Sequence, residues 1–177
     1  MKIRLVRFNP YFLLLVVAMV ASCKTTGERN RDKAISTFRL HLEGNPGGTE
    51  STAVIQIAGV ELYVNNLPFL DETSVTNAAV VDTRDGGFAI QVQYDRHGTL
   101  VLDSVTTENR GRRIAIFTQY GARKLEHSRW LAAPYGSPIT DGVLIFTPMA
   151  TRQESEEIVL GLNNVAKKIG KRNKYSS

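Results

Sequence analysis

The chain has 177 residues, with 22 Lys and Arg against 17 Asp and Glu, and a single cysteine. This length allows one domain with a genuine hydrophobic core and little more. A single cysteine excludes an internal disulfide. The sequence lacks a basic stripe with interleaved aromatic residues, so nucleic acid is not an expected partner.

The chain begins with a basic segment and a short apolar run. Lys2, Arg4 and Arg7 precede apolar residues 11–21. A run of this length is about half of the roughly 20 residues that a membrane-spanning helix needs. The pattern therefore predicts a signal peptide over residues 1–22.

The end of this run, Val20-Ala21-Ser22-Cys23, resembles the lipobox of bacterial lipoprotein precursors. In that family small residues precede a cysteine that receives diacylglycerol, although leucine is commoner where Val20 stands. The resemblance implies recognition through Val20, Ala21 and Ser22, and lipid on Cys23 as the first mature residue. An ordinary secretory signal cut near Ala21, or an uncleaved anchor, are the alternatives.

A lipidated Cys23 places the protein in the bacterial cell envelope, facing the periplasm. In enteric-type bacteria an aspartate after the cysteine favours retention in the inner membrane. Lys24 stands there in this chain, so the outer membrane is slightly preferred.

Residues 23–35 are predicted to form a flexible tether, since they offer almost no large apolar side chain to offset the entropy of ordering. A single domain is expected over residues 36–166. Its first strands, separated by Gly and Pro turn chemistry, are predicted at 36–42, 53–57 and 60–64.

The middle of the chain has the clearest period-two pattern, at residues 88–94. A helix over 99–110 follows, with Gly111 as its C-cap. Residues 113–117 are almost continuously apolar, which predicts a central strand buried on both faces. Two further strands are expected at 124–131 and 142–146.

The last predicted helix has the strongest signals. Thr151 and Glu154 have the spacing of a capping box, and Gly170 is expected to end the helix. One apolar stripe is formed by Ile158, Leu162, Val165 and Ile169. The basic residues 167–177 are interpreted as a solvated, disordered tail, the alternative being a segment on anionic headgroups.

Two helices laid on one face of a mixed or antiparallel sheet predict an α+β fold. The domain also resembles the periplasmic head subdomain of SecD, a component of the bacterial preprotein export machinery. The resemblance covers about residues 80–166, with a weaker echo over 60–77. It is carried by Gly98, Thr106, Asn109, Gly111, Arg112, Arg113, Ala115 and Ile116, and further along by Pro138, Gly142, Thr151 and Glu154.

The resemblance implies a ferredoxin-like-related head subdomain, in which Gly98 and Gly111 supply unusual dihedrals at the helix ends. Arg112 and Arg113 are candidate contacts to an acidic partner surface, although a solvated strand start is the preferred interpretation. SecD itself is moved by membrane helices that use the proton gradient. We expect no such drive here, because the sequence shows no comparable helices.

The three histidines, His41, His97 and His127, have no recognised ligand spacing, and no nucleophile elbow is present. We therefore expect no metal, no cofactor and no enzymatic activity. Four aromatic residues can either line a groove for an extended peptide or, as preferred, belong to the core: Phe117, Tyr120, Trp130 and Tyr135.

The leading functional hypothesis is a non-enzymatic, lipid-tethered domain that binds exported polypeptides, Sec components or other envelope proteins, through an exposed sheet edge. The alternative is a structural or assembly lipoprotein of the envelope that is unrelated to export. A hydrolase is a distant third. The fold alone does not separate them, because one fold hosts many functions.

Overall fold

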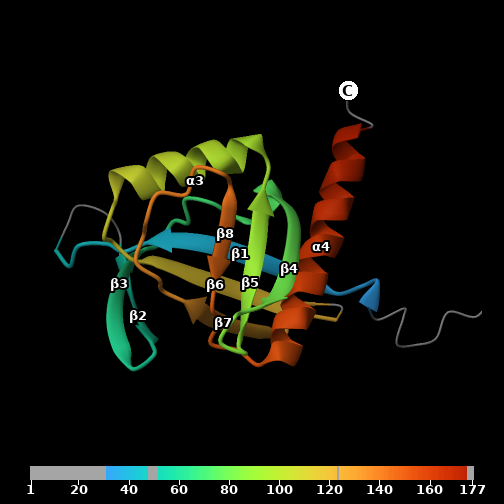
Figure 1. Ribbon diagram of the computed structural model, residues 1–177, viewed down its shortest axis with the longest axis horizontal. Helices are drawn as coiled ribbons and strands as arrows, with labels where there is room; N and C mark the ends of the chain where they lie inside the picture. The colour runs from blue at the N-terminus through green and yellow to red at the C-terminus, as the bar shows by residue number, and fades with distance from the viewer. Residues whose placement is uncertain (1–30, 48–51, 123, 175–177) are drawn as a thin grey trace, which may run out of the picture.

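The computed structural model describes residues 31–47, 52–122 and 124–174, and Figure 1 shows their arrangement. Within these ranges the chain forms two three-stranded antiparallel sheets, a two-stranded hairpin and two α-helices. The predicted α+β class is therefore confirmed. Cys23, the predicted signal peptide and most of the predicted tether lie outside the described residues.

The first sheet has the strand order β1 (Ile35–Leu42), β6 (Ile114–Gly121), β7 (His127–Ala132). The prediction that residues 113–117 form a central strand buried on both faces is confirmed. Ile114 and Ile116 face the main core, whereas Ala115 faces a smaller one. This sheet consequently has a covered face and a second face that only the hairpin shields.

The second sheet has the order β4 (Val75–Asp82), β5 (Phe88–Tyr94), β8 (Val143–Phe146). Strand β4 is absent from the sequence prediction. Its pairing with β5 shifts register between Val75 and Asn77, and this irregularity breaks the period-two alternation by which strands are recognised. The bounds of β5 agree with the prediction residue for residue.

The hairpin consists of β2 (Thr52–Ile57) and β3 (Val60–Asn65), and a 3₁₀ turn, η1 (Glu72–Ser74), precedes β4. The two-residue turn of the hairpin, Ala58-Gly59, has φ values of 52° and 75°. Two positive φ values are the geometry of the turns whose twist suits a hairpin. Ala58 is not a glycine, so this turn holds a strained residue, which costs about 1–2 kcal/mol.

The main core lies between the two sheets and the helices. Its fully buried side chains come from both sheets, from α3 (Arg96–Glu108) and from α4 (Arg152–Lys174). The largest of them are Phe38, Leu40, Ile90, Leu102, Ile116, Leu131, Ile158 and Leu162. A second, smaller core of Ile55, Leu62, Val64 and Ala115 joins the hairpin to the first sheet.

Helix α3 begins at Arg96, three residues before the prediction, because the carboxylate of Asp95 caps it by accepting from the Gly98 N–H at 2.7 Å. The helix ends at Glu108 with Asn109 as its C-cap, so the prediction of a helix to residue 110 capped by Gly111 is wrong, although Gly111 does have a positive φ, of 81°. The expectation for Gly98 is wrong. A Cβ there would lie 2.9 Å from the Cβ atoms of Ser74 and Tyr94, so close packing requires this glycine.

Helix α4 confirms the predicted capping box, since the Glu154 carboxylate accepts from the Thr151 N–H at 2.8 Å. The prediction that Gly170 ends the helix is wrong. The helix continues to Lys174, because an exposed glycine costs only about 1 kcal/mol and lysine and arginine are good helix formers. The described part of the predicted tail, residues 167–174, is therefore helical.

The chain joins the fold earlier than predicted. Ala34 is buried and Ile35 already pairs with Gly121. The side-chain amide of Asn164 on α4 donates to the Arg31 carbonyl at 2.8 Å and to the Ala34 carbonyl at 3.1 Å. Contacts with residues that are distant in sequence thus stabilise the ordering of residues 34 and 35.

Neither helix of the described ranges combines the length with the apolar character that a bilayer span requires. Within the same ranges, no group of three or more His, Cys, Asp or Glu side chains is placed to hold a metal ion. His41 lies on β1, His97 on α3 and His127 on β7.

Candidate functional site

The hairpin packs on the face of the first sheet that turns away from the main core, and two hollows lie beside it. The tip hollow, of about 360 Å³, is lined by Ile57, Ala58, Arg113, Ala132, Ala133, Pro134, Phe146, Thr147 and Met149. The base hollow, of about 190 Å³, is lined by Arg39, His41, Ala53, Val64, Asn65, Asn66, Phe117 and Trp130. Each hollow has one arginine in its lining and no carboxylate.

The base hollow is built on three packed rings. Trp130 lies 4.9 Å from Phe117 and 5.4 Å from His41 between ring centroids, and the His41 contact is edge-on. Alternation along β1 explains the position of His41, because Phe38 and Leu40 face the main core and Arg39 and His41 face the other side. The result is an apolar floor with a guanidinium at its rim.

His41 also fastens the hairpin to the sheet. Its Nδ1 lies 2.8 Å from the Asn65 carbonyl at the end of β3, so Nδ1 carries the proton and donates it. Burial lowers the pKa of His41 below 6.5, the nearby charge of Arg39 lowers it further, and the Asn65 contact opposes both. The ring is therefore held in its neutral form in the folded protein at neutral pH.

The tip hollow holds the predicted partner contact Arg113. Its guanidinium lies 4.7 Å from the ring centroid of Tyr135 and donates to the Tyr135 hydroxyl at 2.9 Å. Tyr135 is 66% exposed, and Met149, which also lines the hollow, is 46% exposed. The hollow thus combines a flexible apolar side chain with a cation that an aromatic ring positions.

Arg112 does not join Arg113. Its guanidinium donates to the Asn109 side chain at 3.1 Å, at the end of α3. Neighbours on an extended segment point to opposite sides, so the two arginines were never placed to act together. Both arginines were predicted as possible partner contacts, but only Arg113 lines a hollow.

The four aromatic residues divide among different environments. Phe117 and Trp130 meet in the base hollow, and Tyr135 stands outside the tip hollow on Arg113. Tyr120 is buried in the main core, as preferred from the sequence. Trp130 also packs against the smaller core. The preferred core interpretation is therefore right for Tyr120, right in part for Trp130, and wrong for Tyr135, which is exposed.

The sheet edges, which were predicted to bind a partner, are partly covered by other segments of the chain. The Leu70 carbonyl accepts a hydrogen bond from the main chain of β1, and the Met149 N–H donates one to the main chain of β7. The side-chain amide of Asn163 bonds to the main chain of β4. Asn163 imitates a strand, because its amide both donates to and accepts from the Ala78 main chain at 2.9 Å.

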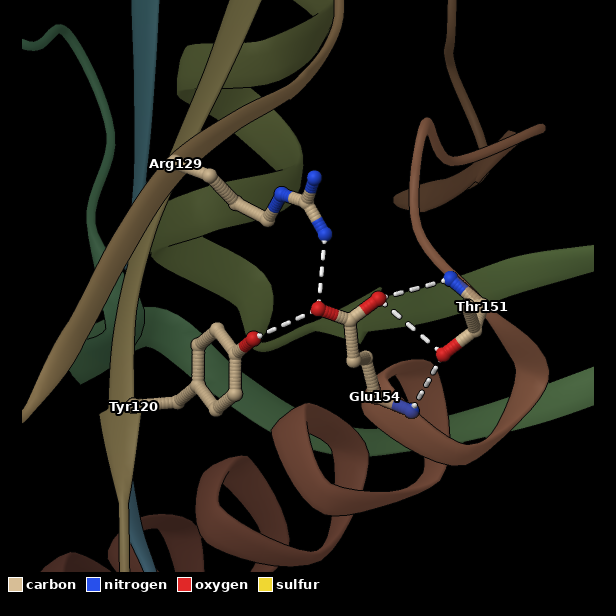
Figure 2. Close-up of polar contacts among 4 residues, drawn as sticks. All are labelled: Tyr120, Arg129, Thr151 and Glu154. Carbon is tan, nitrogen blue, oxygen red and sulfur yellow. Dashed lines mark hydrogen bonds and ion pairs between the residues drawn. The ribbon is translucent and has the colours of Figure 1, made fainter.

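A polar cluster on the other face of the first sheet positions β7 (Figure 2). One oxygen of Glu154 on α4 accepts from the Arg129 guanidinium at 2.8 Å and from the Tyr120 hydroxyl at 3.1 Å. Arg129 precedes Trp130 on β7, so its side chain points to the opposite face. The cluster consequently fixes the strand that carries the floor of the base hollow.

Two pKa values reflect this arrangement. Hydrogen bonds from Thr151, followed by those from Tyr120 and the charge of Arg129, hold the pKa of Glu154 below its ordinary value, against the effect of burial. Burial, and then the carboxylate of Glu154, raise the pKa of Tyr120. The carboxylate is therefore ionised and the phenol protonated at neutral pH, which is the pairing that the contacts in Figure 2 require.

We expect Glu154→Ala to lower the free energy of unfolding by about 1–2 kcal/mol, since the helix loses its capping box and Tyr120 loses its acceptor. The folded-state pKa of Glu154 is depressed, so its contribution is complete above the unfolded-state value and is lost as pH falls through the folded-state value. Denaturant unfolding at pH 7 and pH 3 should show a smaller difference between variant and native chain at pH 3. An equal difference at both pH values contradicts the assignment, and the exposed Glu156→Ala serves as control.

Solved structures of SecDF are similar to this chain. A crystal structure of SecDF in a super-membrane-facing form aligns with 80% of the chain, with a TM-score of 0.56 and 17% sequence identity. A structure of SecDF, a membrane component that enhances protein export, aligns with 81% of the chain, with a TM-score of 0.56 and 18% identity. The chain has a SecD-like fold. No protein-family model matches it, and no curated protein matches it by sequence.

The SecD-like fold covers different shares of the two matched chains. This chain spans about a fifth of the first, 21% of its length, and 70% of the second. The resemblance in fold that the glycine and arginine pattern indicated is confirmed. Sequence identity at this level shows the fold alone, so the role of the hollows depends on their own chemistry.

Several residues of the hollows were not predicted as binding residues. Arg39 and His41 alternate with buried residues of β1, and this signal was enough to place them on the second face of the sheet. Met149 and Ala58 gave no such signal. They reach the tip hollow only because the hairpin turn and the segment after β8 meet beside β7.

Proposed function

We propose that this chain is a non-enzymatic envelope protein that binds extended polypeptide segments in connection with protein export. The observation that carries the proposal is the pair of hollows beside the hairpin of a SecD-like fold. Exposed Met149 and the Trp130 and Phe117 rings offer adaptable apolar contact, and Arg113 and Arg39 offer hydrogen-bond donors to main-chain carbonyls. One matched structure is named as a membrane component that enhances protein export.

The strained turn at Ala58 supports the same surface. A non-glycine residue at positive φ persists only where its surroundings hold it, and such residues cluster at functional sites. Ala58 lines the tip hollow, so a bound segment would touch the strained turn directly.

We expect Trp130→Ala to weaken binding of a fluorescently labelled, permanently unfolded polypeptide about tenfold, because aromatic anchors dominate such interfaces. Fluorescence anisotropy with the full-length chain in detergent measures the effect. Leu100→Ala is the control, since Leu100 is 61% exposed on α3 and lines neither hollow. Equal affinities of native chain and Trp130→Ala, or equal loss in both variants, would refute the assignment of the site.

Crosslinking in cells tests the link to export. A photoreactive residue at position 149 should capture many chains in transit, and the capture should stop when protein synthesis is blocked. The same residue at position 100 should capture few. A single fixed envelope partner at position 149, unaffected by the block, would instead favour the assembly lipoprotein.

We also propose that the protein is held at a membrane through lipid on Cys23, facing the periplasm, with the outer membrane slightly preferred. The lipobox resemblance of residues 20–23 supports this. Anchoring by two or three acyl chains is stable, whereas a single chain binds only marginally and reversibly.

Cys23→Ala should abolish incorporation of labelled palmitate and release the protein from membranes after an alkaline wash. Metabolic labelling followed by membrane fractionation measures both. Thr26→Ala, in the same segment, should leave labelling unchanged. Persistent labelling of the Cys23→Ala protein would refute the lipid site.

A further inference from the structure

The C-terminal half of α4 carries the densest positive charge of the described residues. Lys167, Lys168, Lys171 and Arg172 are all exposed, and the sequence has no Asp or Glu after Glu157. Figure 1 shows this part of the helix standing at the side of the molecule, with its end away from both sheets. These residues were predicted to belong to a disordered tail, and the structure places them on a helix instead.

The helix concentrates the four cations on one face. Lys167 and Lys171 are four residues apart, as are Lys168 and Arg172, and the two pairs lie side by side. A disordered tail would spread the same charges over many directions. We call the face that these four side chains form the basic face.

The chain enters the domain on this same side of α4. Asn164 lies three and four residues before Lys167 and Lys168, so it belongs to the same face, and its amide holds the Arg31 and Ala34 carbonyls. Arg31 and Lys33 are exposed and add two cations there. The basic face therefore borders the point from which the N-terminal segment leaves.

An apolar hollow lies beside this entry point. It measures about 210 Å³, and its lining includes Ala34, Ala122 and Leu160, with Arg31 and Glu157 also contributing. A surface that joins apolar area to a row of cations suits an amphipathic partner. A purely polar polyanion has no part that would fill the hollow.

We propose that the basic face of α4 docks on a bilayer that contains anionic phospholipid. Arg31 lies eight positions after Cys23, and an extended chain covers at most about 3.5 Å per residue. A lipid on Cys23 would thus keep the membrane within about 30 Å of Arg31, which borders the basic face. The docking depends on α4 and stands whether or not Cys23 carries lipid and whether or not the hollows bind polypeptide.

Docking would orient the domain. Each Lys or Arg near an anionic surface strengthens association about fivefold, so four of them contribute about several hundredfold at low salt. Their attraction is screened within about 10 Å at 0.1 M salt. The basic face would then hold α4 against the lipid, which leaves the molecule a preferred side toward the membrane instead of free rotation on its tether.

Amine footprinting on the full-length chain tests the proposal. The chain is reconstituted in phosphatidylcholine vesicles, with or without about 30% phosphatidylglycerol, and acetylation of single lysines is followed by mass spectrometry. We expect Lys167, Lys168 and Lys171 to react several-fold more slowly on the anionic vesicles, with the protection lost at about 1 M salt. Lys33, exposed at the chain entry beside the basic face, should be protected in the same way. Equal rates for the α4 lysines on both vesicles would overturn the proposal, as would protection by soluble polyglutamate equal to that by vesicles.

A charge variant provides the second test. Replacing the four cations of the basic face with glutamine should abolish the difference in acetylation of Lys33 between the two vesicle types. The matched control removes the same charge from exposed positions away from the basic face, through Arg84→Gln, Arg96→Gln, Arg110→Gln and Arg152→Gln. If the control removes the Lys33 difference as fully as the α4 variant, net charge and not the basic face is responsible, and the proposal fails. Trp130→Ala should leave the footprint unchanged, which separates this result from polypeptide binding.

Discussion

Gly161→Ala is expected to lower the free energy of unfolding by about 3 kcal/mol, although alanine is the better helix former. Gly161 lies on α4 where the helix meets the start of β1. A Cβ at this position would stand 2.1 Å from Ser36 Oγ and 2.7 Å from main-chain atoms of Ile35 and Ser36. The main chain of β1 cannot move aside as a flexible side chain can, so the helix must shift and the buried contacts of Ile158 and Leu162 loosen.

Gly170→Ala is the matched control on the same helix. No heavy atom lies within 4 Å of its added Cβ, so this change should raise the free energy of unfolding by up to about 1 kcal/mol. Chemical denaturation of both variants measures the pair. Opposite signs support the close approach of α4 to β1, and stabilisation by Gly161→Ala would contradict it.

Phe38→Ala is expected to cost about 3–5 kcal/mol of the free energy of unfolding. Phe38 on β1 is 0% exposed, and its ring centroid lies 6.0 Å from that of Phe146 on β8. The side chain thus fills the space between the two sheets, and its removal leaves a cavity that neither sheet can close without losing other contacts.

Thermal unfolding followed by circular dichroism measures this loss. A domain of this size should unfold roughly 10 °C or more lower in the variant. Leu100→Ala, at an exposed position of α3, should change stability by less than about 0.5 kcal/mol. A Phe38→Ala protein as stable as the Leu100→Ala protein would mean that the two sheets do not pack through Phe38.

Local sequence patterns account for most elements of the fold. The capping box of Thr151 and Glu154, the alternation of residues 88–94 and the apolar run in β6 each express a preference that neighbours in sequence set. The resemblance to SecD also rested on short-range spacing around Gly98 and Gly111, and the fold agrees with it.

The predictions that the structure corrects depend on features that a local sequence pattern does not report. Strand β4 has a register shift that destroys its period, and the helical end of α4 depends on a helix that the main core already anchors upstream. Gly98 is needed because Ser74 and Tyr94 pack against it, and no pattern within its own helix reports that contact.

The residues of the candidate site likewise depend partly on local pattern and partly on long-range contacts. Sequence alone placed Arg113, Trp130 and Phe117 among the functional candidates, and β1 alternation was enough to turn His41 away from the main core. Whether such residues meet depends on pairings between segments that lie far apart in the chain. His41 finds the Asn65 carbonyl, Arg129 finds Glu154, and the basic residues of α4 come to border the chain entry through Asn164.

Composition, caps and periodicity are local properties, so the chain itself determined its α+β class and the start of α4. Tertiary structure decided which of those elements share a sheet, where the two hollows open and which face of α4 carries free charge. Long-range packing settles these points because burial of the core selects one arrangement of elements whose local preferences are compatible with several.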